Sequence, residues 1–294
     1  MRWNGRMSTH AQPDRILRIV DLAMKLGRRH LAAYGSYKSR HDFVQAQLMT
    51  CLILRTYWKT TYRGVIEQLA VSSEVRKAIG LKKLPHYSTL AKFAARPKVL
   101  EVMGAMLATL AKSVEAADTS VCKDAAMDAT GLPSTCASAH FESRRGKRHR
   151  RYVKLGVLVL CGSLVPASMA LGWGPSNDKV QARELLDKAS CAVRPDILYA
   201  DAGYDAHWVH ERCAEWGVMS VIKPVKHGEG PPRGLYRSQM TEKTLKKLGY
   251  GRRWHAETFM SGMKRTMGST LNATTERGLM IDAATKVLAY AIRR

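Results

Sequence analysis

The sequence lacks a long hydrophobic run, closely paired cysteines and a signal peptide. Its longest nearly unbroken apolar segment, residues 155–161, is far shorter than the ~20 residues that a membrane-spanning helix needs. The first residues hold no apolar stretch followed by a small-residue cleavage site. The six cysteines are scattered, which favours reduced thiols over a disulfide framework or a zinc ribbon. These absences predict a soluble protein of the cytoplasm.

Acidic residues are scarce as well: 24 Asp and Glu stand against 48 Lys and Arg, which gives a formal net charge of +24. Such a surface attracts polyanions through counterion release, and nucleic acid is the usual one. A protein that binds acidic membranes would instead concentrate its charge on one amphipathic helix. Because 46% of the 294 residues are hydrophobic, the chain can bury a sizeable core, and this excludes wholesale disorder.

The first third of the chain has a helical pattern. Apolar residues recur at three- and four-residue spacing in 15–34 and 43–58. Two shorter helices are expected at 63–70 and 88–95. The turn between them allows either a helix-turn-helix that contacts DNA or a packed helical module with no such role. A longer helix over 99–117 leads out of this region.

From residue 121 the pattern changes to short apolar strands and then to alternating strands and helices. The expected strands are 125–131, 152–160, 165–171, 197–200 and 218–222, and the expected helices are 178–189 and 207–216, with a mostly helical segment from 240 on. Three strands in series followed by strand–helix alternation predict a mixed sheet of the α/β or α+β class. This change predicts a boundary between a helical domain, 1–118, and a mixed-sheet domain, 119–294.

Two aspartates at the ends of expected strands are candidates for metal binding. Asp128 closes the first strand and Asp201 the fourth, so each carboxylate would lie on a rigid element at the rim of the sheet. Their nearest alternatives are Asp124, at the start of its strand, and Asp205, which follows the Gly-Tyr turn and suits a helix cap. Alone, an Asp before a turn is more often a cap or a turn former.

A third carboxylate lies among cations in the C-terminal part. Residues at positions 0, +3, +7 and +14 of one α-helix project within roughly 60° of each other. Here these are Tyr250, Arg253, Glu257 and Lys264. One face would then carry a carboxylate flanked by two cations and a phenol. Such a face suits a metal held beside phosphates better than an ordinary solvated charge pattern.

This spacing matches the Y-x2-R-x3-E-x6-K signature of bacterial insertion-sequence transposases of the families numbered 4 and 5, and the sequence resembles family 5 more. Asp128 in Met-Asp-Ala-Thr-Gly and Asp201 in Ala-Asp-Ala-Gly-Tyr resemble the two aspartate motifs of the same DDE enzymes. The segment 175–178 is similar to the one before the helix that precedes the second aspartate. The helical N-terminal third, with His-Tyr-Ser-Thr-Leu at 86–90, resembles the family-5 N-terminal domain. The resemblance spans about residues 40–294.

The resemblance implies an RNase H-like catalytic core in which Asp128, Asp201 and Glu257 form a triad that binds two Mg²⁺ or Mn²⁺ ions. It implies the transposase reaction, in which double-stranded DNA is cut at the terminal inverted repeats of an element and joined to target DNA. It also implies a homodimer or a larger synaptic complex, no membrane, and association with the bacterial nucleoid. The domain 1–118 would then serve DNA binding or dimerisation.

Two groups of residues are expected to contact DNA. By the resemblance, Tyr250, Arg253 and Lys264 lie near the cleaved phosphate, where Arg can bind bidentately and Lys adds a point charge. A loop between the first two strands holds six Lys or Arg within 144–151, and we expect it to contact the DNA backbone, although such runs are often only solvated. The six are Arg144, Arg145, Lys147, Arg148, Arg150 and Arg151.

Other polar residues have plainer interpretations. His207, His210 and Cys213 recur every three residues without a fourth ligand nearby, so an ordinary helix face is favoured over a zinc site. Asp178 suits the start of a helix, and His255 suits phosphate binding or packing. Two alternative functions stay open. One is an enzyme of this fold that cleaves DNA without strand transfer, and the other is a domesticated, catalytically silent DNA-binding or regulatory protein.

Overall fold

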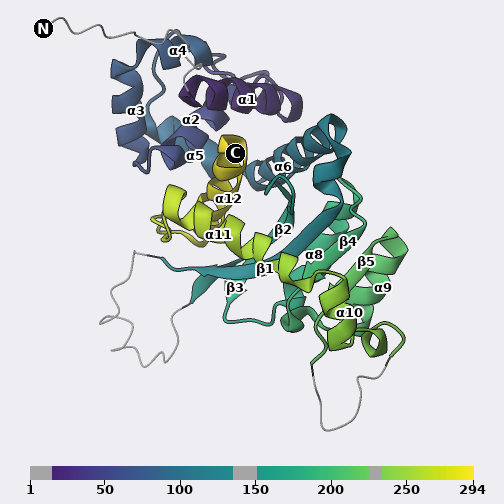
Figure 1. Ribbon diagram of the computed structural model, residues 1–294. Coiled ribbons are helices and arrows are strands. Elements are labelled where there is room, and N and C mark those ends of the chain that lie inside the picture. The colour runs from purple at the N-terminus through teal and green to yellow at the C-terminus, as the bar shows by residue number, and fades with distance from the viewer. Residues whose placement is uncertain (1–14, 135–150, 226–233) are drawn as a thin grey trace, which may run out of the picture.

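The computed structural model describes residues 15–134, 151–225 and 234–294, and a five-stranded mixed sheet forms its centre. The strands are β1 (Asp124–Leu132), β2 (Tyr152–Leu160), β3 (Pro166–Gly174), β4 (Ile197–Ala200) and β5 (Met219–Ile222). Their order in the sheet is β3-β2-β1-β4-β5. The pairs β1–β2 and β2–β3 are antiparallel, while β4 is parallel to β1 and β5 to β4 (Figure 1). This is the RNase H-like arrangement, and the predicted fold class is confirmed.

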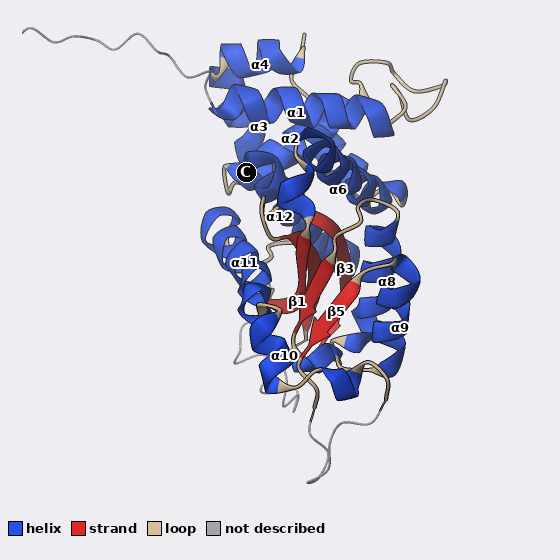
Figure 2. Cartoon of the chain, turned by 45° about the vertical axis from the view of Figure 1, so that its right-hand side comes forward, coloured by secondary structure: helices blue, strands red, loops and turns tan. Residues whose placement is uncertain are grey.

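Helices cover both faces of the sheet, as Figure 2 shows. On one face lie α8 (Lys179–Ser190) and α9 (His207–Trp216), and on the other α10 (Glu242–Lys247) and α11 (Trp254–Met267). The helices α8 and α9 are the crossovers that precede and follow β4, because parallel strands need a long connection. With both faces covered, β2 is buried along almost its whole length, which explains its nearly continuous apolar sequence.

The first helices of the chain pack together with the last one. The N-terminal helices are α1 (Arg15–His30), α2 (Gln45–Tyr57), α3 (Tyr62–Val71), α4 (Ser73–Ile79), α5 (Tyr87–Ala94) and α6 (Lys98–Ala117), and the last helix is α12 (Glu276–Arg293). In Figure 1, α12 lies between α2 and α6. A buried ion pair, 2.7 Å long, joins Arg55 of α2 to Asp282 of α12. No helix in the described part of the chain is long and apolar enough to cross a membrane.

The prediction of one α-helix from Tyr250 to Lys264 is wrong for its first turn. Residues Tyr250–Arg253 form a 3-10 turn, η4, and the α-helix begins only at Trp254. Gly249, with φ 71°, stands in the left-handed region just before the turn, and Gly251 lies within it. Glycine weakens a helix, so the two glycines set a separate start for this segment.

Gly262 allows α11, which carries Glu257, to pack closely on α12. A Cβ at this position would collide with the hydroxyl of Tyr290, a buried residue of α12. We expect Gly262→Ala to lower the free energy of unfolding by about 1–3 kcal/mol, measured by urea denaturation. Gly104→Ala in α6 is the matched control, because a Cβ there has no neighbour within 4 Å. This variant should raise the free energy of unfolding by about 0.5–1 kcal/mol. A loss of the same size in both variants would contradict this packing.

Candidate functional site

Asp128 and Asp201 lie next to each other where β1 and β4 part. The parallel register of the two strands ends with Met127 opposite Ala200, so the next residue on each strand is one of these aspartates. Side chains alternate between the faces of a sheet, and this register therefore places both carboxylates on the same face. The expectation that Asp128 closes its strand is wrong, because β1 continues to Leu132. The strand that ends at this point is β4, because a 3-10 turn, Ala202–Tyr204, follows directly after Asp201.

Glu257 approaches the same face from α11. It lies in the first turn of this helix, which packs on β1. Two turns further on, the ammonium of Lys264 donates to the hydroxyl of Thr130 at 2.6 Å. Thr130 shares its face of β1 with Asp128, because the two residues are two positions apart. This hydrogen bond therefore fixes α11 along the half of the strand that carries Asp128.

The electrostatics of Asp128 show that several carboxylates are close together. Burial, and after it the negative charges of Glu257, Asp201 and Asp178, raises the pKa of Asp128 from 3.8 to about 6. The backbone N–H of Ala129, which donates to the carboxylate at 2.7 Å, opposes this rise. Glu257, Asp201 and Asp178 are thus near enough to Asp128 to act on its charge, although burial has the larger effect.

Each carboxylate is held by a local partner. Asp128 and Asp201 accept hydrogen bonds from the backbone N–H of the residues that follow them, the latter at 2.6 Å from Ala202. Glu257 forms an ion pair with Arg253, one turn before it. Across the described ranges, no three His, Cys, Asp or Glu side chains form a group that could hold a metal ion. Glu257 and Asp201 thus act electrostatically on Asp128, but the three side chains do not stand in a ready metal-binding arrangement.

The 3-10 turn η4 brings Tyr250 and Arg253 to these carboxylates. Burial, and then the charge of Asp201, raises the pKa of Tyr250, while Arg253 opposes the rise. The guanidinium of Arg253 lies 6.0 Å from the centre of the Tyr250 ring. Asp124, the alternative to Asp128, forms an ion pair with Arg252 of the same turn. The structure therefore places Tyr250 and Arg253 beside these carboxylates, while Lys264 binds Thr130, two residues along β1 from Asp128.

Most of the predicted basic loop lies outside the described residues. This holds for Arg144, Arg145, Lys147, Arg148 and Arg150. Arg151 is described and exposed, and its guanidinium donates to Glu276 of α12 at 2.6 Å. It also lies 4.0 Å from the centre of the Trp173 ring.

An ion pair between a buried lysine and a partly exposed aspartate beside the site was missed by the sequence analysis. Lys154 of β2 is 6% exposed, and its ammonium lies 2.6 Å from the carboxylate of Asp178. Asp178 stands at the start of α8, as expected, but makes no side-chain cap. A Cβ on Gly203 would lie 2.8 Å from Asp178, so this pair abuts the turn that carries Asp201. The signal in the sequence was the one lysine within an otherwise apolar strand.

Tyr204 is a second residue that was not singled out. Its side chain is completely buried, and its hydroxyl has no hydrogen-bond partner among the described residues. Burial, and after it the charges of Asp178, Asp128 and Asp201, raises the pKa of Tyr204. The phenol therefore stays protonated and can donate a hydrogen bond close to these carboxylates.

Asp205 does not cap the helix that follows it, contrary to expectation. The cap position belongs to Ala206, and Asp205 is buried instead. Its carboxylate accepts two hydrogen bonds from Arg237, at 2.7 and 2.8 Å, and one from the N–H of Val225 at 2.7 Å. Burial opposes ionisation, but these donors hold the pKa of Asp205 below its ordinary value. Asp205 therefore ties the Asp201 turn to the segment after β5.

The histidines of α9 have separate partners. His207 pairs with Glu211 at 3.0 Å, and His210 lies 2.7 Å from the hydroxyl of Ser220. Burial raises the pKa of the Cys213 thiol to about 12, which makes it a poor metal ligand. Near η4, the ring of His255 lies 2.7 Å from the backbone oxygen of Arg252.

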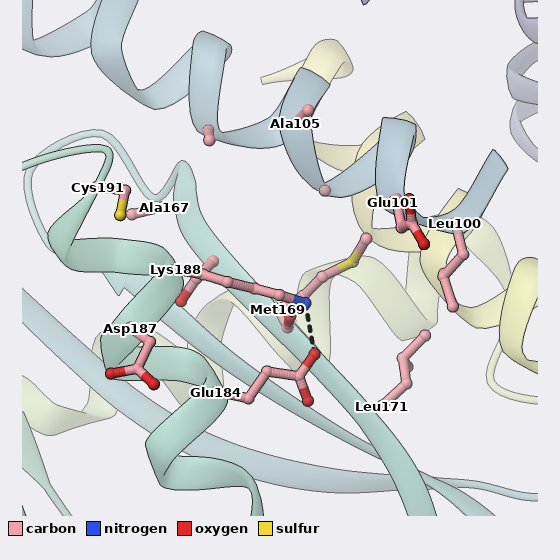
Figure 3. Close-up of a pocket in the computed structure, with 13 residues that line it drawn as sticks. Leu100, Glu101, Ala105, Ala167, Met169, Leu171, Glu184, Asp187, Lys188 and Cys191 are labelled. Carbon is pink, nitrogen blue, oxygen red and sulfur yellow. Dashed lines mark hydrogen bonds and ion pairs between the residues drawn. The ribbon is translucent and has the colours of Figure 1, made fainter. Parts of the chain in front are cut away.

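A large apolar cavity lies elsewhere, at the β3 edge of the sheet. It has a volume of about 530 Å³ and opens between α6, β3 and α8. Figure 3 shows Leu100, Met169 and Leu171 lining it, with an ion pair between Lys188 and Glu184 at its rim. Two strands separate β3 from β4, and none of the three carboxylates contributes to the lining. This cavity is therefore distinct from the carboxylate site.

The raised pKa of Asp128 gives a prediction for stability. The folded state holds the proton more tightly than the unfolded state, so stability falls as the pH rises from about 4 to about 6 and stays low above. We expect Asp128→Asn to raise the free energy of unfolding at pH 7.5 by about 2 kcal/mol and to change little near pH 4. Urea denaturation in EDTA measures both. Asp196→Asn, an exposed aspartate, is the control, and a gain for Asp128→Asn at both pH values would contradict the prediction.

Comparison with known families places this site within a recognised domain. The family model described as "Transposase DDE domain" matches residues 123–292, more than half of the chain. The matched range contains Asp128, Asp201 and Glu257. A comparison with curated proteins gave no match. The range of the family match and the fold agree, and the chain belongs to the family of proteins that carry a transposase DDE domain.

Proposed function

We propose that this protein is an insertion-sequence transposase that cleaves DNA at the ends of its element and joins these ends to target DNA. Asp128, Asp201 and Glu257 are its catalytic carboxylates. The observation that carries the proposal is the position of Glu257, which acts electrostatically on Asp128 beside Asp201 within the DDE domain. The Tyr250 to Lys264 spacing supports a place in the insertion-sequence families 4 and 5, nearer to family 5.

The donor set fits divalent metal ions of the Mg²⁺ or Mn²⁺ type. Carboxylate oxygens are the hard ligands that these ions prefer. Burial and the nearby carboxylates both raise the pKa of Asp128, and a bound cation would stabilise its charged form against both. Asp128, Asp201 and Glu257 would hold two ions, which supply activation of the nucleophile and stabilisation of the departing oxygen at phosphorus. Added Mn²⁺ should therefore raise the melting temperature of the wild type and not that of Asp128→Asn.

The cations around the carboxylates orient the DNA. Arg253 can bind a phosphate bidentately when it releases Glu257, and Lys264, held by Thr130, adds a fixed positive charge. Tyr250 adds a phenol next to Asp201. In the first reaction, a water oxygen attacks phosphorus and the 3′-oxygen leaves as a hydroxyl. In the second, this 3′-hydroxyl attacks a phosphodiester of the target and displaces the 3′-oxygen there.

The rest of the chain would bind and arrange the DNA. The helical region 1–118 is the proposed domain for DNA binding or dimerisation. The basic run 144–151 and the net charge of +24 favour contacts with the phosphate backbone. Double-stranded DNA at terminal inverted repeats and at the target is the proposed partner, bound by a homodimer or a larger synaptic complex. We infer that the protein acts at the bacterial nucleoid.

A cleavage and joining assay tests this function. The substrate is a labelled duplex that carries one end of the element, incubated with the protein and Mg²⁺ or Mn²⁺. The proposal expects metal-dependent nicks at the end and labelled products joined to a second DNA. Nicks without joined products would instead identify a nuclease of this fold. Tight DNA binding without either product would identify a silent DNA-binding or regulatory protein.

A further inference from the structure

A polar cavity of about 210 Å³ lies between the ends of α2 and α11 and the side of α12. Its lining contains three cations, Arg55, Lys59 and Lys286, and one acid, Asp282. Three positive charges against one negative charge leave an excess of two. We call this cavity the α2–α11 pocket.

The single acid of the pocket is already used. Asp282 binds Arg55 at 2.7 Å, and both side chains are at most 10% exposed. The Nε atom of Arg55 is buried and has no hydrogen-bond partner among the described residues. Because this nitrogen is closed off from solvent, Arg55 acts on a ligand in the pocket through its positive charge.

Within the described residues, the hydrogen bonds of the two lysines go to backbone oxygens. Lys286, 8% exposed, donates to the carbonyl of Met267, and Lys59 donates to that of Arg265 at 3.3 Å. These carbonyls end α11, where the helix dipole favours cations but supplies no full negative charge. Burial lowers the pKa of Lys286 to about 8, with Asp282 opposing and the neighbouring cations Arg55 and Lys59 adding to the effect. Lys286 is therefore still largely protonated at neutral pH.

This arrangement suits a phosphate group. Excess positive charge in a partly buried pocket is stabilised by an anion, and Arg and Lys are the residues that bind phosphate oxygens. Thr56 and Thr60 are also among the lining residues, and threonine is a common phosphate contact in DNA complexes. Gly268, with φ 88°, leaves the space in front of Lys286 open, since a Cβ there would lie 3.2 Å from its ammonium.

The helix α11 connects the pocket to the carboxylate site. Glu257 lies in its first turn and Met267 at its end, which is ten residues or about 15 Å along the axis. Lys264 lies between the two. The rise of B-DNA, about 3.4 Å per step, is measured along the duplex axis, and neighbouring phosphates of one strand lie farther apart, so this length corresponds to only a few steps along a strand. A strand that follows α11 from the carboxylates would therefore bring a phosphate to the pocket.

We propose that the α2–α11 pocket binds one backbone phosphate of the DNA, a few steps from the phosphodiester that is cleaved. The identification of the ligand as DNA rests on the proposed function. The contact joins α2 of the N-terminal region to α11 and α12 through the substrate. It would set the register of the strand at the carboxylates, because phosphate contacts position DNA without reading its sequence.

Lys59→Gln in the full chain is the test variant, since Lys59 is exposed and its loss leaves the core intact. Lys112→Gln, an exposed lysine of α6 outside the pocket, is the matched control. Fluorescence anisotropy measures the binding of an element-end duplex without divalent metal, at about 50–200 mM salt. We expect Lys59→Gln to bind about five- to tenfold more weakly and to lower the salt slope by about 0.9, as for one phosphate contact. A slope equal to that of the wild type would overturn the proposal.

Neutral methylphosphonates placed singly along the duplex locate the contact. At one position, a few steps from the cleaved bond, the wild type should lose about fivefold in affinity while Lys59→Gln loses nothing further. Equal losses for both proteins at every position would overturn the proposal. Lys286→Met keeps an apolar side chain of similar length in the buried site and should give the same pattern, provided that its melting temperature shows a folded protein.

Inorganic phosphate separates DNA from a free anion as the ligand. If phosphate raises the melting temperature more than chloride does at equal ionic strength, while Lys59→Gln binds DNA like the wild type, the pocket binds a free anion and the proposal is wrong. The assay also separates this proposal from the function. Glu257→Gln should show the full Lys59 effect on DNA binding, so a protein that never cleaves DNA can still confirm the pocket.

Discussion

Replacing Glu257 with Gln is expected to abolish DNA cleavage and joining and to leave DNA binding unchanged. The substitution keeps the shape of the side chain and removes the charge that would hold a divalent ion beside Asp128 and Asp201. Metal ions supply several kcal/mol of transition-state stabilisation in phosphoryl transfer. Because each 1.36 kcal/mol is a factor of ten, the rate should fall by about a thousandfold or more. Labelled products of a single-turnover reaction measure this loss.

The control for this variant is Glu215→Gln. Like Glu257, Glu215 is an exposed glutamate in an ion pair with an arginine, here Arg212 at 3.0 Å, but it lies on α9 across the sheet. Its change should leave the rate within about twofold, as for surface sites in general. If Glu257→Gln kept a tenth of the wild-type rate, or if it lost DNA binding together with activity, a catalytic role of this carboxylate would be wrong.

The second large effect is expected on stability, from Asp205→Ala. The side chain of Asp205 is fully buried and holds Arg237, which is 19% exposed, by two hydrogen bonds. Removing one partner of a buried pair leaves the other charge uncompensated, which costs about 3–5 kcal/mol. Urea denaturation at neutral pH measures this loss. Since the pKa of Asp205 is lowered, the wild type should keep the stabilisation down to acidic pH and lose it only below the ordinary value of 3.8.

Asp187→Ala provides the comparison, because Asp187 also binds an arginine but is exposed. Its carboxylate lies 2.7 Å from Arg212, and its side chain is 48% exposed. Surface pairs contribute about 0–1 kcal/mol. Similar losses for the two variants would show that the Asp205 pair contributes no more than a surface contact and that it does not fix the Asp201 turn.

Local sequence patterns predicted much of the sheet. The segment 152–160 has an unbroken β-rich apolar pattern, and the predicted strand agrees with Tyr152–Leu160. The same holds for Ile197–Ala200 and for the helix His207–Trp216. The helix Ser73–Ile79 was missed, because its seven residues include only three apolar side chains and give no clear period. This helix is held by Val75 and Ile79, which pack in the core, and such packing cannot be recognised from the local sequence.

The candidate site depended on motifs, and its surroundings depend on contacts across the chain. Asp128, Asp201 and Glu257 could be singled out because strand ends and fixed spacing are written in the sequence. The partner of Asp205 is 32 residues away at Arg237, and no local rule connects the two. The pair of Lys154 and Asp178 joins β2 to the start of α8 in the same way. The Tyr250–Arg253 turn was misassigned because two glycines were outweighed by a helical spacing.

The most direct test of the account is a crystal structure of the protein with an element-end duplex and Mn²⁺, in which anomalous scattering locates the metal. The account predicts two Mn²⁺ ions, roughly 3.5–4 Å apart, bound by Asp128, Asp201 and Glu257 next to a DNA phosphate. Metal bound at other residues, or three carboxyl groups that stay more than ~10 Å apart with DNA present, would contradict it, because no metal pair could then bridge them.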